Sequence, residues 1–170
     1  MKINGYKLRE SMKRFELQRD AAEVRFPHSL YAFEGDKKDS ADSIMESLVK
    51  AEEGIANLQT VQSAYNLQVR VRVQGTEMTL CNAIKLMGGA TRAENLWKIA
   101  AGTKKARGSY DPGPQLVRQN DQTVAKAVLG PKGLLERATK ASTYAAAIRS
   151  AVAQGNATEL DLDMDPKLLA

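Results

Sequence analysis

The side chains with the clearest chemical potential are basic, and they gather in the middle of the chain. Arg70 and Arg72 alternate with valines, so a strand would place both guanidinium groups on one face. A second basic cluster precedes an aromatic residue and comprises Lys104, Lys105, Arg107 and Tyr110. Guanidinium forks match phosphate oxygens, and an aromatic ring can stack on a base. These residues predict a site for a phosphate-bearing ligand, with a solvated polar face as the alternative.

A glycine pair, Gly88–Gly89, interrupts an otherwise helical pattern and is followed by Thr91 and Arg92. Each glycine inside a helix costs about 1 kcal/mol relative to alanine, so the pair needs a reason. One reason is close packing or a kink of the helix. The other is an anion that approaches the backbone N–H groups, with Thr91 and Arg92 completing its site. The spacing matches neither a Walker motif nor a dinucleotide-binding fingerprint.

No residues pair in a way that predicts catalysis. His28 is the only histidine and Cys81 the only cysteine, and neither has a partner suited to a nucleophile and its base. Cys81 opens a predicted helix, whose N-terminus can favour a thiolate, but a buried structural cysteine is the simpler interpretation. Asp161, Asp163 and Asp165 alternate and could face a hard cation or form a solvated acidic tail. We therefore predict a non-enzymatic protein without a metal or cofactor.

Composition and charge restrict the class of protein and of partner. Hydrophobic residues make up 43% and aromatic residues 5% of the chain, a balance typical of helix bundles. The net charge of +5 favours an anionic partner. That charge is uneven, because residues 34–66 hold three basic and seven acidic side chains, whereas residues 67–126 hold ten basic and four acidic ones. The lone cysteine and the absence of a long apolar stretch lead us to expect a cytoplasmic protein with no membrane partner.

Hydrophobic periodicity predicts four helices in this chain of 170 residues. We expect Pro27 to end the first helix, because the residue before a proline is pushed out of the α region. Apolar residues of the second helix recur with heptad spacing from Ile44 to Tyr65. The expected helices run from Asn4 to about Val24, from Ser40 to Tyr65, from Leu80 to about Ala101, and from Gly130–Pro131 to Gly155–Asn156.

The segments between and after these helices complete the predicted fold. Strict alternation in residues 69–73 and a Gln74–Gly75 turn predict a β-hairpin over residues 68–80. Residues 102–122 predict a long basic loop, and residues 158–170 an acidic tail with one edge strand. The predicted fold is therefore all-α, a single domain over residues 1–170 built as an antiparallel bundle of about four helices with an inserted hairpin. We expect the heptad face and the hairpin edge to join subunits into an oligomer.

Three short motifs resemble a known family. They are Ala64–Tyr65–Asn66 at a helix end, Met78–Thr79–Leu80–Cys81–Asn82–Ala83 opening the next helix beyond a Gly75 turn, and the final run from Ala153 to Leu160. Together they resemble the septicolysin-like family of small bacterial helical proteins, over about two thirds of the chain. The resemblance implies helical hairpins joined by a β-hairpin in an oligomer, and it implies no activity. The chain departs from the family in its glycine pair and its basic loop.

These observations predict a homo-oligomer in which basic side chains of several subunits surround pockets for a phosphate-bearing small molecule, a nucleotide or a signalling nucleotide. Sequestering a signalling nucleotide, as compact phage counter-defence proteins do, is one form of this role. The alternatives are a nucleic-acid-binding or phage-associated accessory protein, and a purely structural oligomer. The predicted ligand-binding residues are Arg70, Arg72, Gly88, Gly89, Thr91, Arg92, Lys104, Lys105, Arg107 and Tyr110.

Overall fold

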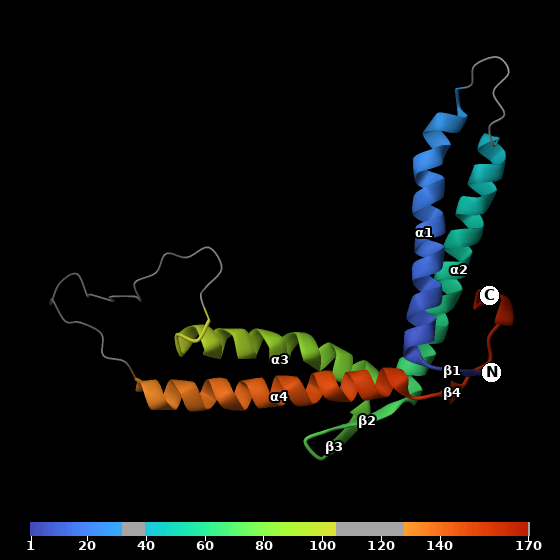
Figure 1. The fold of residues 1–170 in the computed structure, drawn as a ribbon. Coiled ribbons are helices and arrows are strands. Elements are labelled where there is room, and N and C mark those ends of the chain that lie inside the picture. The colour runs from blue at the N-terminus through green and yellow to red at the C-terminus, as the bar shows by residue number, and fades with distance from the viewer. Residues whose placement is uncertain (32–39, 105–127, 170) are drawn as a thin grey trace.

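Four long helices dominate the structure, a computed structural model that describes residues 1–31, 40–104 and 128–169. They are α1 (Gly5–Ser29), α2 (Ala41–Gln68), α3 (Leu80–Ala100) and α4 (Pro131–Ala157). α1 packs along α2 and α3 along α4, each pair antiparallel (Figure 1). The two pairs diverge from one corner, and we name them the α1·α2 arm and the α3·α4 arm. The predicted all-α fold of four helices with an inserted hairpin is confirmed.

The predicted β-hairpin lies at the corner where the two arms meet (Figure 1). Its strands are β2 (Arg70–Val73) and β3 (Thr76–Thr79), which pair antiparallel. Gln74 and Gly75 have φ angles of 47° and 87°, and two positive values in succession are what a two-residue type I′ turn requires. The valines of β2 are buried and its arginines exposed. The alternation of the sequence therefore orients the strand as predicted.

A second small sheet joins the two ends of the chain beside the same corner. β1 (Lys2–Ile3) pairs antiparallel with β4 (Leu160–Asp161), and the amino group of Met1 is ion-paired with Asp161. A 3-10 helix (Pro166–Leu168) follows. The acidic side chains of this segment are exposed, as in a solvated tail, but apolar residues between them pack against the core. The segment therefore folds back onto its own chain.

The first helix is longer than the sequence predicts. α1 continues through Pro27 to Ser29, so the prediction that it ends near Val24 is wrong. A proline removes one backbone donor and crowds the carbonyl group four residues before it. Only two residues of α1 follow Pro27, so the lost hydrogen bond and the crowding fall near the C-terminal end of the helix. The helix therefore ends soon after the proline and not before it.

The last helix also continues beyond its predicted end. Gly155 does not end α4, which extends to Ala157. A Cβ atom on Gly155 would lie 2.7 Å from Cγ1 of Val71 and 2.8 Å from Cδ1 of Leu80, closer than side chains can approach. The glycine therefore allows α4 to lie against β2 and the start of α3.

The heptad face of α2 is covered by α1 within the same chain. Its apolar residues Ile44, Ile55, Leu58 and Tyr65 are buried. A Cβ atom on Gly54 would lie 2.6 Å from the ring of Phe15, so the two helices are in close contact. This face is not free to join subunits, which corrects the expectation drawn from its spacing. No helix in the described part of the chain is both long and apolar enough to span a membrane.

Candidate functional site

A groove with a volume of about 640 Å³ lies where the two arms meet, and all four helices contribute side chains to it. We name it the corner groove. α1 contributes most of its lining residues, α2 contributes Gln62, and α3 and α4 contribute the others. Its lining includes Arg9, Met12, Lys13, Ile84, Met87 and Val152. The groove exists only because the arms diverge, so it joins residues that are far apart in the sequence.

The corner groove combines an apolar floor with a charged rim. Met12, Ile84 and Met87 are half-buried and pack against the hydrophobic core. Arg9 and Lys13 are exposed, and their spacing of four residues places them on the same side of α1. Glu16 adds one half-buried carboxylate to the lining, so the two cations outnumber it. Apolar walls with a few polar groups are typical of small-molecule sites. The arrangement suits a ligand with one anionic end and one apolar or aromatic end.

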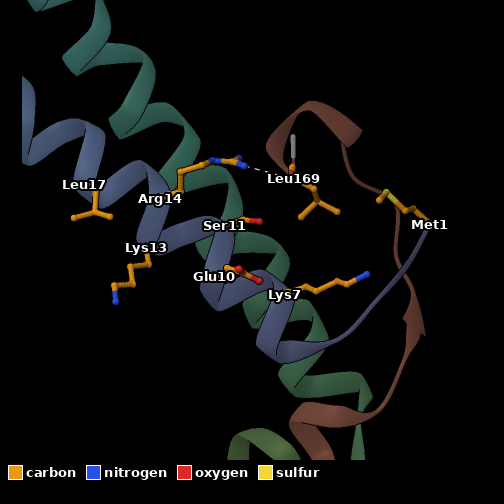
Figure 2. A pocket seen from close by; sticks show the side chains of 8 residues that line it. All are labelled: Met1, Lys7, Glu10, Ser11, Lys13, Arg14, Leu17 and Leu169. Atoms are coloured by element: carbon orange, nitrogen blue, oxygen red, sulfur yellow. Dashed lines mark hydrogen bonds between the residues drawn. The ribbon is translucent and has the colours of Figure 1, made fainter.

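A second groove, of about 620 Å³, lies between α1 and the C-terminal segment (Figure 2). Arg14 donates hydrogen bonds to the carbonyl oxygens of Leu168 and Leu169 at 3.2 and 3.3 Å. Its guanidinium group is therefore already engaged in holding the C-terminal segment. Lys13 points away from that segment (Figure 2). This groove mainly holds the chain's own C-terminal segment. It is therefore a weaker candidate for a ligand-binding site than the corner groove.

The hairpin arginines lie where the sequence places them, on one exposed face of β2. Arg72 lies opposite Glu77 in the hairpin, and Nη2 of Arg72 is 3.9 Å from Oε2 of that carboxylate. Both side chains are more than half exposed, so this ion pair contributes little to stability. Arg70 and Arg72 thus remain accessible to an anion from solvent.

The glycine pair lies inside the continuous helix α3 and faces open space. A Cβ atom on Gly89 would have no neighbour within 4 Å, and one on Gly88 would meet only Nη1 of Arg92 at 3.6 Å. Close packing within the described chain therefore does not explain the pair. The N–H groups of residues inside a helix bond to carbonyl groups four residues earlier, which leaves them unavailable to an anion. Arg92 is exposed beside the pair, whereas Thr91 is half-buried.

The predicted basic residues do not converge within one chain. Lys104 lies just beyond the end of α3, where its Nζ atom donates to Oδ1 of Asn95 at 2.6 Å. The hairpin lies before the start of α3, whose 21 residues span about 30 Å at 1.5 Å per residue. Arg70 and Lys104 therefore lie at opposite ends of the α3·α4 arm. The predictions for Lys105, Arg107 and Tyr110 fall outside the described residues.

A buried carboxylate between α3 and α4 is not evident from the sequence. Glu94 is 7% exposed and accepts hydrogen bonds from Lys98 at 2.7 Å and from Arg149 at 3.0 Å. These two hydrogen bonds, that of Lys98 first, lower the pKa of Glu94 to about 2. The spacing of Glu94 and Lys98 is visible in the sequence, but Arg149 is 55 residues away. Both carboxylate oxygens of Glu94 accept hydrogen bonds, so the side chain holds α3 and α4 together rather than acting as a base.

The remaining reactive residues lie apart from one another. His28 is exposed in the last turn of α1, and Cys81 is half-buried in the first turn of α3. Over residues 1–31, 40–104 and 128–169, no group of three or more histidine, cysteine or acidic side chains could hold a metal ion. Neither residue lines the corner groove.

The chain matches no family model, no curated protein and no solved structure. The resemblance to septicolysin-like proteins accordingly stays a prediction. The functional interpretation depends on the geometry of the chain itself, and the corner groove is the cavity in which side chains of all four helices come together.

Proposed function

We propose that this protein is a non-enzymatic, cytoplasmic binding protein that acts as a homo-oligomer and holds a phosphate-bearing small molecule, such as a nucleotide. The observation that carries the proposal is the corner groove, where Arg9 and Lys13 lie at the edge of an apolar floor. Withholding a signalling nucleotide, as a phage counter-defence protein would, is one form of this function.

The two ends of such a ligand would meet different parts of the groove. The guanidinium group of Arg9 can contact two phosphate oxygens at once, and the ammonium group of Lys13 adds a second positive charge. Thioether and aliphatic side chains from Met12, Ile84 and Met87 offer an adaptable surface to a flat base. The volume of about 640 Å³ falls within the range of small-molecule sites.

The basic residues of the hairpin and of α3 enter this function only in an assembled form. Arg70 and Lys104 lie too far apart to contact one small ligand in a single chain. Copies placed around a common axis would bring such residues from different subunits together, as the sequence predicts. A pocket between subunits would use Arg92 and would not use Arg9. Mutating each arginine therefore distinguishes a site between subunits from a site in the corner groove.

Affinity measurements on purified protein test the proposal. Native mass spectrometry reports any retained ligand, and calorimetry with ATP, GTP and pyrophosphate gives affinities. We expect Arg9→Ala and Lys13→Ala each to weaken nucleotide binding at least tenfold. Lys132→Ala, an exposed cation at the start of α4, is the matched control and leaves affinity unchanged. Absence of any nucleotide or pyrophosphate binding would overturn the proposal, and loss of affinity only in Arg92→Ala would move the site to a subunit interface.

Nucleic acid binding is the second candidate, because exposed cations are spread along the α3·α4 arm. Arg70, Arg92 and Lys104 extend over about 30 Å, a length suited to a polymer rather than to a small ligand. Polymer binding weakens steeply and linearly with the logarithm of salt concentration. We expect a steep salt dependence that Arg92→Ala reduces and Arg9→Ala leaves intact if this candidate is correct. Absence of both kinds of binding would favour a purely structural oligomer.

A further inference from the structure

The side of α2 opposite its buried residues carries acidic and apolar side chains. Met45 and Val49 are exposed there, 39% and 49% respectively. Asp42, Glu46 and Glu53 surround them together with one basic residue, Lys50, and the group outlines a shallow groove of about 370 Å³. We name this surface the acidic face of α2. Among residues 1–31, 40–104 and 128–169 no other element covers it, because α1 packs on the opposite side of the helix.

An exposed side of α3 has the opposite charge. Lys85 and Arg92 are exposed on it, with Gly88 and Gly89 between them and Leu96, 69% exposed, one turn further on. In the part of the chain that the structure describes, neither Lys85 nor Arg92 forms an ion pair. We name this surface the basic face of α3.

The two faces match in spacing as well as in charge. Glu46 and Glu53 are seven residues apart, as are Lys85 and Arg92, which in a helix is about 10.5 Å. Two helices laid side by side would therefore form both ion pairs at once. Val49 lies midway between the two acids, and the glycine pair lies midway between the two bases. The branched side chain of Val49 would thus pack against Gly88 and Gly89, where α3 has no side chains.

We propose that a second copy of this chain occupies these faces, with the acidic face of α2 in one copy docked on the basic face of α3 in the other. Repulsion between like charges opposes the pairing of two acidic faces or of two basic faces. It therefore favours pairing of the acidic face of α2 with the basic face of α3. Glu46 now pairs with Lys50 at 3.7 Å, but both side chains are about three-quarters exposed. Such an exposed pair is weak, and Glu46 can exchange partners.

This interface gives the glycine pair a role that packing within one chain does not. A backbone without Cβ atoms lets a neighbouring helix approach closely, and Gly88 and Gly89 provide one on the exposed side of α3. The arms diverge, so α2 and α3 of one copy run in different directions (Figure 1). Two reciprocal contacts would close a dimer, and head-to-tail contacts would give a ring or a filament. The inference rests on the oligomeric part of the proposed function and is independent of the ligand.

Charge reversal tests the interface. We expect the full-length protein to be oligomeric by light scattering coupled to gel filtration. Arg92→Glu and Glu53→Lys should each raise the dissociation constant at least tenfold, with an unchanged far-ultraviolet circular dichroism spectrum. Combining Arg92→Glu with Glu53→Lys should restore assembly if the helices run parallel, and combining it with Glu46→Lys if they run antiparallel. Lys132→Glu is the matched control and should leave the mass unchanged.

Mixing the two single variants provides a second readout. Each retains one intact face, so an equimolar mixture should form a complex that neither variant forms alone. An oligomer that survives every reversal would overturn this interface while leaving oligomerisation intact. A monomer at all concentrations would overturn both, and nucleotide binding at the corner groove would still be measured separately. Loss of nucleic acid binding in Arg92→Glu without a change in mass would assign the basic face to a polyanion and overturn the inference.

Discussion

The hydroxyl oxygen of Tyr65, near the end of α2, lies 2.6 Å from the carbonyl oxygen of Gly155, near the end of α4. The same hydroxyl lies 2.7 Å from the carbonyl oxygen of Thr158, and the side chain is fully buried. Burial raises the pKa of the Tyr65 hydroxyl, and a hydrogen bond from the backbone N–H of Gly5 partly offsets that rise. The start of α1 and the ends of α2 and α4 meet at this ring, so Tyr65 connects the two arms.

Replacing Tyr65 by phenylalanine should therefore destabilise the whole fold. The variant keeps the ring but leaves the buried carbonyl group of Gly155 and the partly buried one of Thr158 without the hydroxyl proton that they share, which costs about 1–3 kcal/mol. Urea unfolding followed by circular dichroism measures the change. Tyr144→Phe is the control, because that side chain is 37% exposed on α4. Equal stability of the two variants would show that the Tyr65 hydroxyl does not hold the corner.

Two glycines in neighbouring helices should respond to alanine in opposite directions. Gly155→Ala brings a methyl group to within 3 Å of Val71 and Leu80, and such overpacking costs about 1–3 kcal/mol. Gly89→Ala has free space around it and should stabilise α3 by up to about 1 kcal/mol. Thermal unfolding should show a lower midpoint for the first variant and a higher one for the second. The Gly89 comparison is made in an Arg92→Glu background, where assembly does not contribute.

The elements that the sequence predicts well are those set by local interactions. Ser40 and Thr79, residues that favour helix N-termini, cap α2 and α3 by accepting hydrogen bonds from backbone N–H groups three residues later. Gly102, expected only as the first residue of a loop, ends α3 with φ of 69°, and the bonds from Gly102 to Ile99 and from Thr103 to Lys98 complete a left-handed cap. Each of these features depends on a few residues that are adjacent in the chain.

The features that sequence reasoning misses depend on contacts between distant segments. Pro27 and Gly155 are residues that usually end helices, yet neither does so here. Gly155 is needed because Val71 of β2 and Leu80 of α3 lie close to its backbone, and no local sequence pattern reveals this contact. The corner groove also depends on distant segments. Arg9 lines the same groove as Ile84 and Met87 only because the two arms meet at one corner of the fold.

Arg14 should control the order of the C-terminal segment. Its two hydrogen bonds hold the carbonyl oxygens of Leu168 and Leu169, and Figure 2 shows the bond to Leu169. We expect Arg14→Ala to speed amide hydrogen exchange in residues 162–169 at least tenfold while α3 and α4 keep their protection. Lys13→Ala, one residue away and without these bonds, is the control. Unchanged exchange in Arg14→Ala would mean that apolar packing alone retains the segment.

The ion-paired carboxylate of Glu94 should make stability depend on pH in the acidic range. Hydrogen bonds from Lys98 and then Arg149 lower its pKa in the folded protein from an ordinary value of 4.5 to about 2. A lowered pKa means that the folded state holds the charged form more tightly than the unfolded state does. The stabilisation is therefore complete above about pH 4.5 and is lost as the pH falls toward 2.

Comparison with Glu94→Gln isolates this contribution. At pH 7 the variant should be less stable by about 1–2 kcal/mol, because charged hydrogen bonds are lost between partly solvated partners. Unfolding free energies measured from pH 7 to pH 2 check this. The difference in unfolding free energy between the wild-type protein and Glu94→Gln should narrow below pH 4.5 and nearly vanish near pH 2. Glu136→Gln is the control, since Glu136 pairs with Lys140 at 3.2 Å while both side chains are more than 60% exposed. A gap between the wild-type protein and Glu94→Gln that stays constant with pH would show that α3 and α4 are held together by packing and not by this charge.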